Sequence, residues 1–163
     1  MLRDKIYPYL SYVTADGNEV VLSCDGYRDS WECYGREGFG GLSLKQITRQ
    51  YSDGASDTVA MIPEPRVMTI NMVAVGNSTA KRDEILRNII SGLVQIGSST
   101  NWGKLKLMRS DGKMLAIDCV YTGGLDEIVN ELPYIQQFTL EFFSGNGYFY
   151  EVSDPSNTIL TGI

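Results

Sequence analysis

The sequence contains no histidine, and this absence excludes several kinds of active site. Serine–histidine and cysteine–histidine nucleophile systems use an imidazole as the base, so neither is available. Of the three cysteines, Cys24, Cys33 and Cys119, the first two are nine positions apart, which is not a zinc-ligand spacing. We expect all three to be small buried residues with free thiols.

Long apolar runs are also missing. No stretch of about 18 apolar residues occurs, so we expect no transmembrane helix and no membrane partner. Asp4, Lys5 and Pro8 interrupt the N-terminal segment, which also lacks a small-residue cleavage site and so does not resemble a signal peptide. These features predict a protein that is made and kept in a cytoplasm, at least until it is assembled into something larger.

Positive charge is in short supply. The chain has 14 lysines and arginines against 20 aspartates and glutamates, which gives a formal net charge of −6. A protein that grips nucleic-acid phosphates needs a basic face, and no basic run is visible. We therefore expect no specific nucleic-acid binding. An acidic surface suits a protein past which DNA must move without sticking.

Motifs for catalysis or cofactor binding are absent. The acidic cluster of Asp25, Asp29 and Glu32 does not have the spacing of a calcium loop. The glycine-rich run at residues 35–41 lacks the lysine of a phosphate-binding loop and has no strand-to-helix setting. We expect no catalytic residue, no metal and no cofactor, and hence that the protein is not an enzyme.

One segment, residues 79–95, has the periodicity of an amphipathic helix. Ser78 or Thr79 can cap its first turn with a hydroxyl group. Polar side chains, Arg82 among them, are predicted on the outer face. The apolar residues form one broad stripe, which comprises Ile85, Leu86, Ile89, Ile90, Leu93 and Val94. We expect this helix to brace a sheet structure.

About eight strand candidates account for most of the remaining chain. They lie at residues 6–14, 20–22, 66–75, 102–108, 113–121, 134–143 and 148–150, with two short ones within 46–62. Turn signals recur at the spacing expected of a sandwich or barrel. Pro8 predicts that the first strand lies at an edge, because proline cannot donate to a ladder. The apolar run at 66–75 is predicted to be central.

Residues 24–45 have a different composition, with glycines interleaved between large aromatics. This pattern predicts a long loop or a set of short irregular strands. Trp31, Phe39 and Trp102 are large and lie near glycines. They are either core side chains of a sheet fold or anchors in a subunit interface, and the sequence leaves both interpretations open.

The order of the motifs resembles a known family. A glycine-rich segment leads to YSDG (51–54) and PRVMTINMVAVG (65–76). The helix with RDEILRNI follows, then LKLMRSDGKMLAIDCVY (105–121) and QQFTLEFFSGNGYFYE (136–151). This order is similar to the N-terminal domain of the distal tail proteins of long-tailed bacteriophages, also called the phage tail family protein.

The resemblance implies a mainly β protein, a tail-tube-like β-sandwich with one flanking helix around residues 79–95. Residues 1–155 would form a single domain. Residues 156–163 would be a tail, or the start of a linker to the C-terminal domain, often carbohydrate-binding, that many members carry. Tyr51, Asp53, Gly54 and Arg66 match the family pattern, with Asp53-Gly54 setting a turn and Arg66 opening the central strand.

The function implied is that of a structural virion protein. Six copies would form a distal tail or baseplate ring around a DNA channel, joining the tail-tube protein to the tail-tip or hub protein. Such a protein is located in the virion tail and is assembled in the host bacterial cytoplasm. The candidate interface residues are Trp31, Phe39 and Tyr51.

Two other hypotheses remain open at this point. One is a carbohydrate-binding or carbohydrate-cleaving β-sandwich, motivated by the aromatics Trp31, Tyr34 and Trp102 with acidic residues nearby. The other is a tail-tube or tube-terminator protein of the same lineage, which differs only in its position along the tail.

Overall fold

The computed structural model describes residues 9–23, 31–94, 102–109, 111–124, 129–131, 134–152 and 159–162, with only the backbone for 129–131 and 159–162. One helix, α1 (Thr79–Leu93), and a series of strands make up these residues. The strands are β1 (Leu10–Val13), β2 (Glu19–Val21), β3 (Trp31–Glu37), β4 (Leu44–Gln50), β5 (Ser56–Pro63), β6 (Arg66–Val75), β7 (Gly103–Met108), β8 (Met114–Gly123), β9 (Val129–Glu131), β10 (Ile135–Ser144), β11 (Tyr150–Val152) and β12 (Ile159–Gly162).

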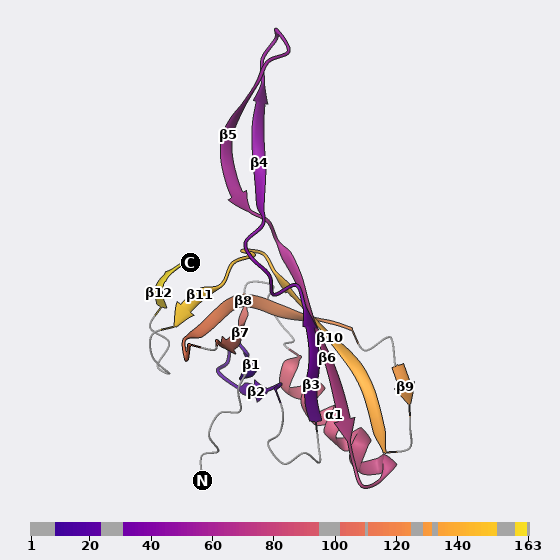
Figure 1. Ribbon diagram of the computed structural model, residues 1–163. Helices are drawn as coiled ribbons and strands as arrows, with labels where there is room; N and C mark the ends of the chain where they lie inside the picture. Colours follow the sequence, from indigo (N-terminus) through magenta and orange to yellow (C-terminus); the bar gives the residue numbers. More distant parts are fainter. Residues whose placement is uncertain are drawn as a thin grey trace.

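The architecture is mainly β and sandwich-like, as predicted (Figure 1). The main sheet has the order β2-β1-β7-β8-β10-β6-β3, and the paired strands are antiparallel. β8 belongs to both layers, because residues 114–119 pair with β7 while residues 120–123 pair with β10. The first part of β8 also pairs with β11, which in turn pairs with β12. The sheet therefore folds over on itself along β8.

The core lies between the two layers. Alternate residues of β6 and β10 are buried, as the period of a strand requires. Their fully or almost fully buried side chains are Met68, Ile70, Met72, Ala74, Phe138, Leu140 and Phe142. The other layer contributes Tyr12, Leu105 and Ile117 to the same cluster, and the rings of Tyr12 and Phe142 lie 5.0 Å apart.

Helix α1 confirms the predicted helix, and its buried residues Ile85, Ile89 and Leu93 join this core. The Ser78 hydroxyl accepts a hydrogen bond of 3.2 Å from the Lys81 backbone N–H. The helix ends at Leu93, two residues before the predicted end at 95, and the Val94 N–H donates to the Ile90 carbonyl. Of the described residues, no helix has the length and apolar character needed to span a membrane.

The assignment of Arg82 to the polar face of α1 is wrong. Its side chain is 4% exposed and forms an ion pair of 2.9 Å with Asp83. The backbone of Gly76 packs so closely that an added Cβ would lie 2.6 Å from the Arg82 nitrogen. Close packing of the first turn onto the end of β6 therefore covers a side chain that the periodicity places outside. At the other end, Val94 is 43% exposed although it was predicted on the apolar stripe.

One strand prediction is refined and another is wrong. Residues 24–45, predicted as a long loop or a set of short irregular strands, contain among their described residues one seven-residue strand, β3, which pairs with β6 and packs Trp31 and Cys33 against the core. A register shift between Cys33 and Gly35 accommodates the glycine-rich sequence within the strand. The first strand is not at an edge, because β1 lies between β2 and β7. Pro8 itself lies outside the described residues.

Most other predictions for regular structure agree with the structure, although the strand predicted at 148–150 lies at 150–152 (β11). The β1–β2 and β7–β8 hairpins form, β6 is central between β10 and β3, and β10 places Phe138, Leu140 and Phe142 inside. The segment 156–163, predicted as a tail or linker, contains a strand that the sequence pattern did not indicate, β12, which pairs with β11.

Candidate assembly interface

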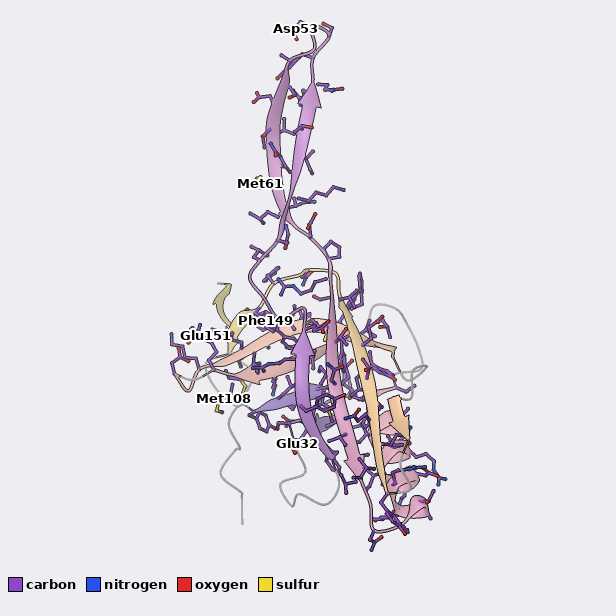
Figure 2. The ribbon with its side chains drawn as sticks, turned by 45° about the vertical axis from the view of Figure 1, so that its right-hand side comes forward. Glu32, Asp53, Met61, Met108, Phe149 and Glu151 are labelled. Carbon is purple, nitrogen blue, oxygen red and sulfur yellow. The ribbon has the colours of Figure 1, made fainter. Side chains whose placement is uncertain are left out.

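The most exposed part of the described chain is a hairpin that projects from the sandwich. β4 and β5 form a separate two-stranded sheet, with register from Leu44 opposite Pro63 to Gln50 opposite Ser56. We call residues 44–63 the arm. Figure 1 shows the arm extending away from both layers, and Figure 2 places Asp53 at its tip and Met61 partway along it.

The tip of the arm is a tight turn, as the Asp-Gly sequence predicts. Gly54 has a φ of +86°, a region that glycine adopts without steric cost. The Asp53 carboxylate accepts a hydrogen bond of 3.0 Å from the Ala55 N–H, and the Tyr51 N–H donates to the Ala55 carbonyl at 2.8 Å. Tyr51, beside this turn, has a side chain that is 47% exposed. Its ring is therefore presented at the far end of the molecule.

The arm has no core of its own. Every residue of β4 and most of β5 are exposed. The exposed apolar side chains are Leu44, Ile47, Tyr51, Val59, Met61 and Ile62, with exposures from 39% to 55%. An isolated two-stranded hairpin is only marginally stable in water, and exposed apolar patches on soluble proteins mark interaction sites. The arm thus has the properties of a surface that another molecule covers.

Both faces of the arm carry apolar side chains. Since side chains alternate along a strand, the register places Leu44 and Met61 on one face and Ile47 and Ile62 on the other. Neither β4 nor β5 pairs with a third strand among the described residues, so the backbone groups at their outer edges are also available for pairing. Complete burial of the arm requires contacts on more than one side.

Arg66, the first residue of β6, fixes the base of the arm. Its guanidinium group donates from Nη1 to the carbonyls of Gly38 and Gly40, at 3.2 and 2.9 Å, and from Nη2 to that of Gly41, at 3.0 Å. The same group lies 5.6 Å from the centroid of the Phe149 ring, which is cation–π distance. Partial burial lowers the pKa of Arg66 from its usual value. The charged fork therefore ties the loop that enters the arm to the strand that leaves it.

Close backbone contacts reinforce this base. A side chain at Gly38 would collide with the carbonyl oxygen of Val67, and one at Gly147 would collide with that of Glu64. Both glycines have positive φ, +78° and +68°. The Glu64 N–H also donates to the Ser43 carbonyl at 2.9 Å, which joins the two ends of the arm. The arm is exposed to solvent along its length but is anchored where it meets the sandwich.

The three predicted interface residues lie in different places. Tyr51 is at the tip of the arm. Phe39 is half-buried at the base, with its ring 5.9 Å from that of Phe149, a residue labelled in Figure 2. Trp31 packs partly against the core, and its indole N–H donates to the Val21 carbonyl at 2.9 Å. The structure brings none of the three together.

Sequence reasoning missed the arm's apolar side chains, such as Ile47 and Met61. The available signal was the pair of β-prone runs on either side of YSDG. That signal predicts a hairpin, whereas the exposure of the hairpin depends on what the rest of the chain leaves uncovered.

The metal-binding and thiol groups of the described residues do not form a catalytic or metal site. The Cys, Asp and Glu side chains found there form no group of three that could hold a metal ion. Asp25, Asp29 and Cys24 lie outside the described residues. Cys33 and Cys119 are free thiols, and burial raises the pKa of Cys119 to about 12. Cys119 is therefore a neutral core residue at ordinary pH.

No protein-family model and no curated protein sequence matches the chain. Solved structures do share its fold. The SPP1 Dit protein, described as a paradigm of the hub adsorption apparatus in phages that infect Gram-positive bacteria, matches 87% of this chain at 10% identity with a TM-score of 0.60. A chain of the phage p2 baseplate, in its activated conformation with calcium, matches 84% at 11% identity with a TM-score of 0.61.

This likeness establishes the fold. The strontium form of the p2 baseplate gives the same result, with a TM-score of 0.59 over 82% of this chain. The chain spans only about half the length of these solved chains, covering 52% of the SPP1 protein and 44% of the p2 chain.

Proposed function

We propose that this chain is a structural subunit of a phage tail, placed at the distal tail or baseplate. Copies of the chain form a ring around a channel through which DNA passes. The observation that carries this proposal is the arm, a hairpin with two apolar faces and no core of its own. The shared fold with the SPP1 Dit protein and the p2 baseplate chain supports the placement in a tail.

The arm of one copy lies on the body of the next copy. Contacts between two different surfaces repeat from subunit to subunit, and they close into a ring when the rotation between neighbours permits. Six is the number of copies that the family resemblance implies. The rigid base around Arg66 supports this arrangement, because an arm with a fixed direction loses less freedom when it docks.

The other parts of the proposal follow from the ring. The tail-tube protein binds one side and the tail-tip or hub protein binds the other, in a virion tail assembled in the host cytoplasm. The net charge of −6 suits a channel that DNA must leave freely. Residues 1–155 act as one domain, onto which residues 159–162 add the strand β12.

The predicted interface residues take different roles in this arrangement. Tyr51 is an anchor at the tip of the arm and contacts the neighbouring copy. Phe39 acts at the base, where its contact with Phe149 supports the direction of the arm. Trp31 holds β3 to the body through its bond to Val21.

The oligomeric state of a matched pair of variants tests the proposal. Val59 in the arm and Val94 after α1 are 49% and 43% exposed, so Val59→Lys and Val94→Lys make the same change at similar exposure. We expect rings from the wild type and from Val94→Lys, and a folded monomer from Val59→Lys. Native mass spectrometry, with and without the tail-tube and hub proteins, measures this.

Two results would overturn the proposal. One is a wild-type chain that stays monomeric at high concentration, even with both partner proteins. The other is a Val59→Lys variant that forms rings as readily as Val94→Lys. Circular dichroism of each variant separates loss of assembly from loss of folding.

A further inference from the structure

A hollow of about 130 Å³ lies on the surface of the sandwich, and none of its lining residues belongs to the arm. Trp102 precedes β7, Asp118 lies in β8, and Gly145 and Asn146 follow β10. These four residues come from three segments that are distant in sequence. The fold therefore gathers an indole ring, a carboxylate and an amide around one concave site.

Trp102 provides an apolar platform in this hollow. Its side chain is 37% exposed, although the ring contacts Phe143 with the centroids 6.1 Å apart. Gly145 leaves the indole uncovered, since a Cβ at that position would lie 3.6 Å from Cη2 of Trp102. A tryptophan held by a neighbouring ring and kept free of a covering side chain is suited to stacking against the apolar face of a ligand.

The polar groups of the hollow are held in place. The Tyr150 hydroxyl donates a hydrogen bond of 2.6 Å to Oδ1 of Asp118. Burial and this carboxylate raise the pKa of Tyr150, so the hydroxyl remains protonated and keeps donating. A carboxylate has about four acceptor positions, and this bond uses one of them. Asn146 is exposed and adds an amide that both donates and accepts.

The charges around the hollow favour a neutral ligand. Lys104 lies opposite Asp118 in the β7–β8 pair, and its ammonium group is 5.9 Å from the centroid of the Tyr150 ring. A cationic ligand would meet this ammonium, and an anionic ligand would meet the Asp118 carboxylate. Neither sign of charge is well matched by the site.

We propose that the hollow is a subsite for a single neutral pyranose ring of a glycan. A pyranose has an apolar C–H face that stacks on Trp102, and it has hydroxyls at its rim that donate to Asp118 and exchange hydrogen bonds with Asn146. The small volume limits the subsite to one ring, so the affinity for a monosaccharide is low. A longer glycan binds more tightly because it can occupy the subsites of several copies of the chain at once.

Saturation-transfer NMR on the full chain tests this subsite, with the methyl pyranosides of glucose, galactose and N-acetylglucosamine as probes. At least one pyranoside should show saturation of its C–H protons with the wild type. Trp102→Ala should weaken the binding about tenfold or more, which is the loss of one good contact. Gly145→Val fills the space against the indole without removing a polar group, and it should abolish the signal.

The matched control is Tyr134→Ala, which removes an aromatic side chain that is 56% exposed and is not among the residues that line the hollow. This variant should bind as the wild type does. The proposal is overturned if no pyranoside gives a signal with the folded wild type, or if Gly145→Val binds normally. A stronger response to choline or to acetate than to any pyranoside also overturns it. Because the hollow lies outside the arm, these outcomes are independent of ring formation.

Discussion

The hairpins β4–β5 and β7–β8 are built around the same three-residue sequence, Ser-Asp-Gly, and make the same turn. In each, the aspartate carboxylate accepts a hydrogen bond of 3.0 Å from the N–H of the residue after the glycine. Gly54 and Gly112 have nearly equal φ values, +86° and +82°. The local chemistry of the two turns is therefore the same.

The strands that leave these turns differ in burial. Leu105 and Ile117 face one another in β7–β8 and are fully buried, whereas Ile47 and Met61 in the arm are 39% and 55% exposed. Three residues are enough to set a turn, but burial depends on what covers the strands. For β7–β8 the cover is the opposite layer of the sandwich. For the arm we propose that the cover is a second molecule.

The largest effect is expected from a charge placed in the core of the body. Ile89→Asp places a carboxylate where the side chain is 3% exposed, which should cost about 4 kcal/mol or more and leave no soluble folded protein. Asn88→Asp adds the same carboxylate to the neighbouring exposed position and should fold normally. Soluble yield and circular dichroism measure both. A stable Ile89→Asp variant would mean that α1 is not packed on the core.

A matched isoleucine pair sharpens the comparison of body and arm. Ile70→Ala in β6 removes a fully buried side chain and should lower the free energy of unfolding by about 2–5 kcal/mol. Ile47→Ala in β4 should change it by less than about 0.5 kcal/mol in the free subunit. Urea unfolding of the monomer measures both. Equal losses would show that the arm contributes to the core after all.

Alkaline pH should destabilise the body through Cys119. The thiol has its usual pKa near 9.0 when unfolded and about 12 when folded. Above pH 9 the unfolded chain therefore binds fewer protons than the folded chain, so stability falls as pH rises from 9 towards 12, by up to about 1.4 kcal/mol per pH unit.

The pH dependence of urea unfolding measures this effect. Cys119→Ala should flatten the slope just above pH 9, the usual pKa of the thiol. Tyr12, whose pKa is raised from 10.0 to about 12, adds a second loss of folding stability that begins about one pH unit higher. An unchanged slope in Cys119→Ala would contradict the burial of a neutral thiol.

A modest effect on global stability is expected at the base of the arm. Arg66→Lys retains the charge but cannot form the three hydrogen bonds to Gly38, Gly40 and Gly41. The loss should be about 1 kcal/mol. The more sensitive readout is hydrogen exchange of the Glu64 N–H, which should become faster. Arg87→Lys on the exposed face of α1 is the control. If the Glu64 N–H exchanges equally fast in both variants, Arg66 does not anchor the base of the arm.

Sequence periodicity correctly predicted those elements whose own apolar spacing matches the face that the structure buries. Helix α1, strand β6 and the β7–β8 hairpin repeat their apolar residues at the period of the element that forms. Arg82 is the exception, because its side chain is buried although the periodicity of its helix places it on the polar face. For β3 the sequence left a loop and short irregular strands both open, because the regular pairing comes from the neighbouring strand β6 and not from the glycine-rich sequence itself.

The candidate interface was less predictable, because the exposure of a side chain depends on other parts of the chain and not on its neighbours in sequence. The YSDG sequence predicted the turn beside Tyr51, but nothing local says that the turn projects into solvent. Phe39 and Trp31 have the size and the glycine neighbours of interface anchors, yet both have contacts within their own chain. Their part in an interface stays a prediction.

Hydrogen–deuterium exchange of residues 44–63 tests most directly the claim that the arm is completed by another molecule. In the free subunit we expect fast exchange throughout the arm and slow exchange in β6 and β10, which lie in the core. In the assembled ring we expect strong protection of the arm, with little change in β6 and β10. An arm that is already protected in the monomer, or that exchanges equally fast after assembly, would contradict this claim.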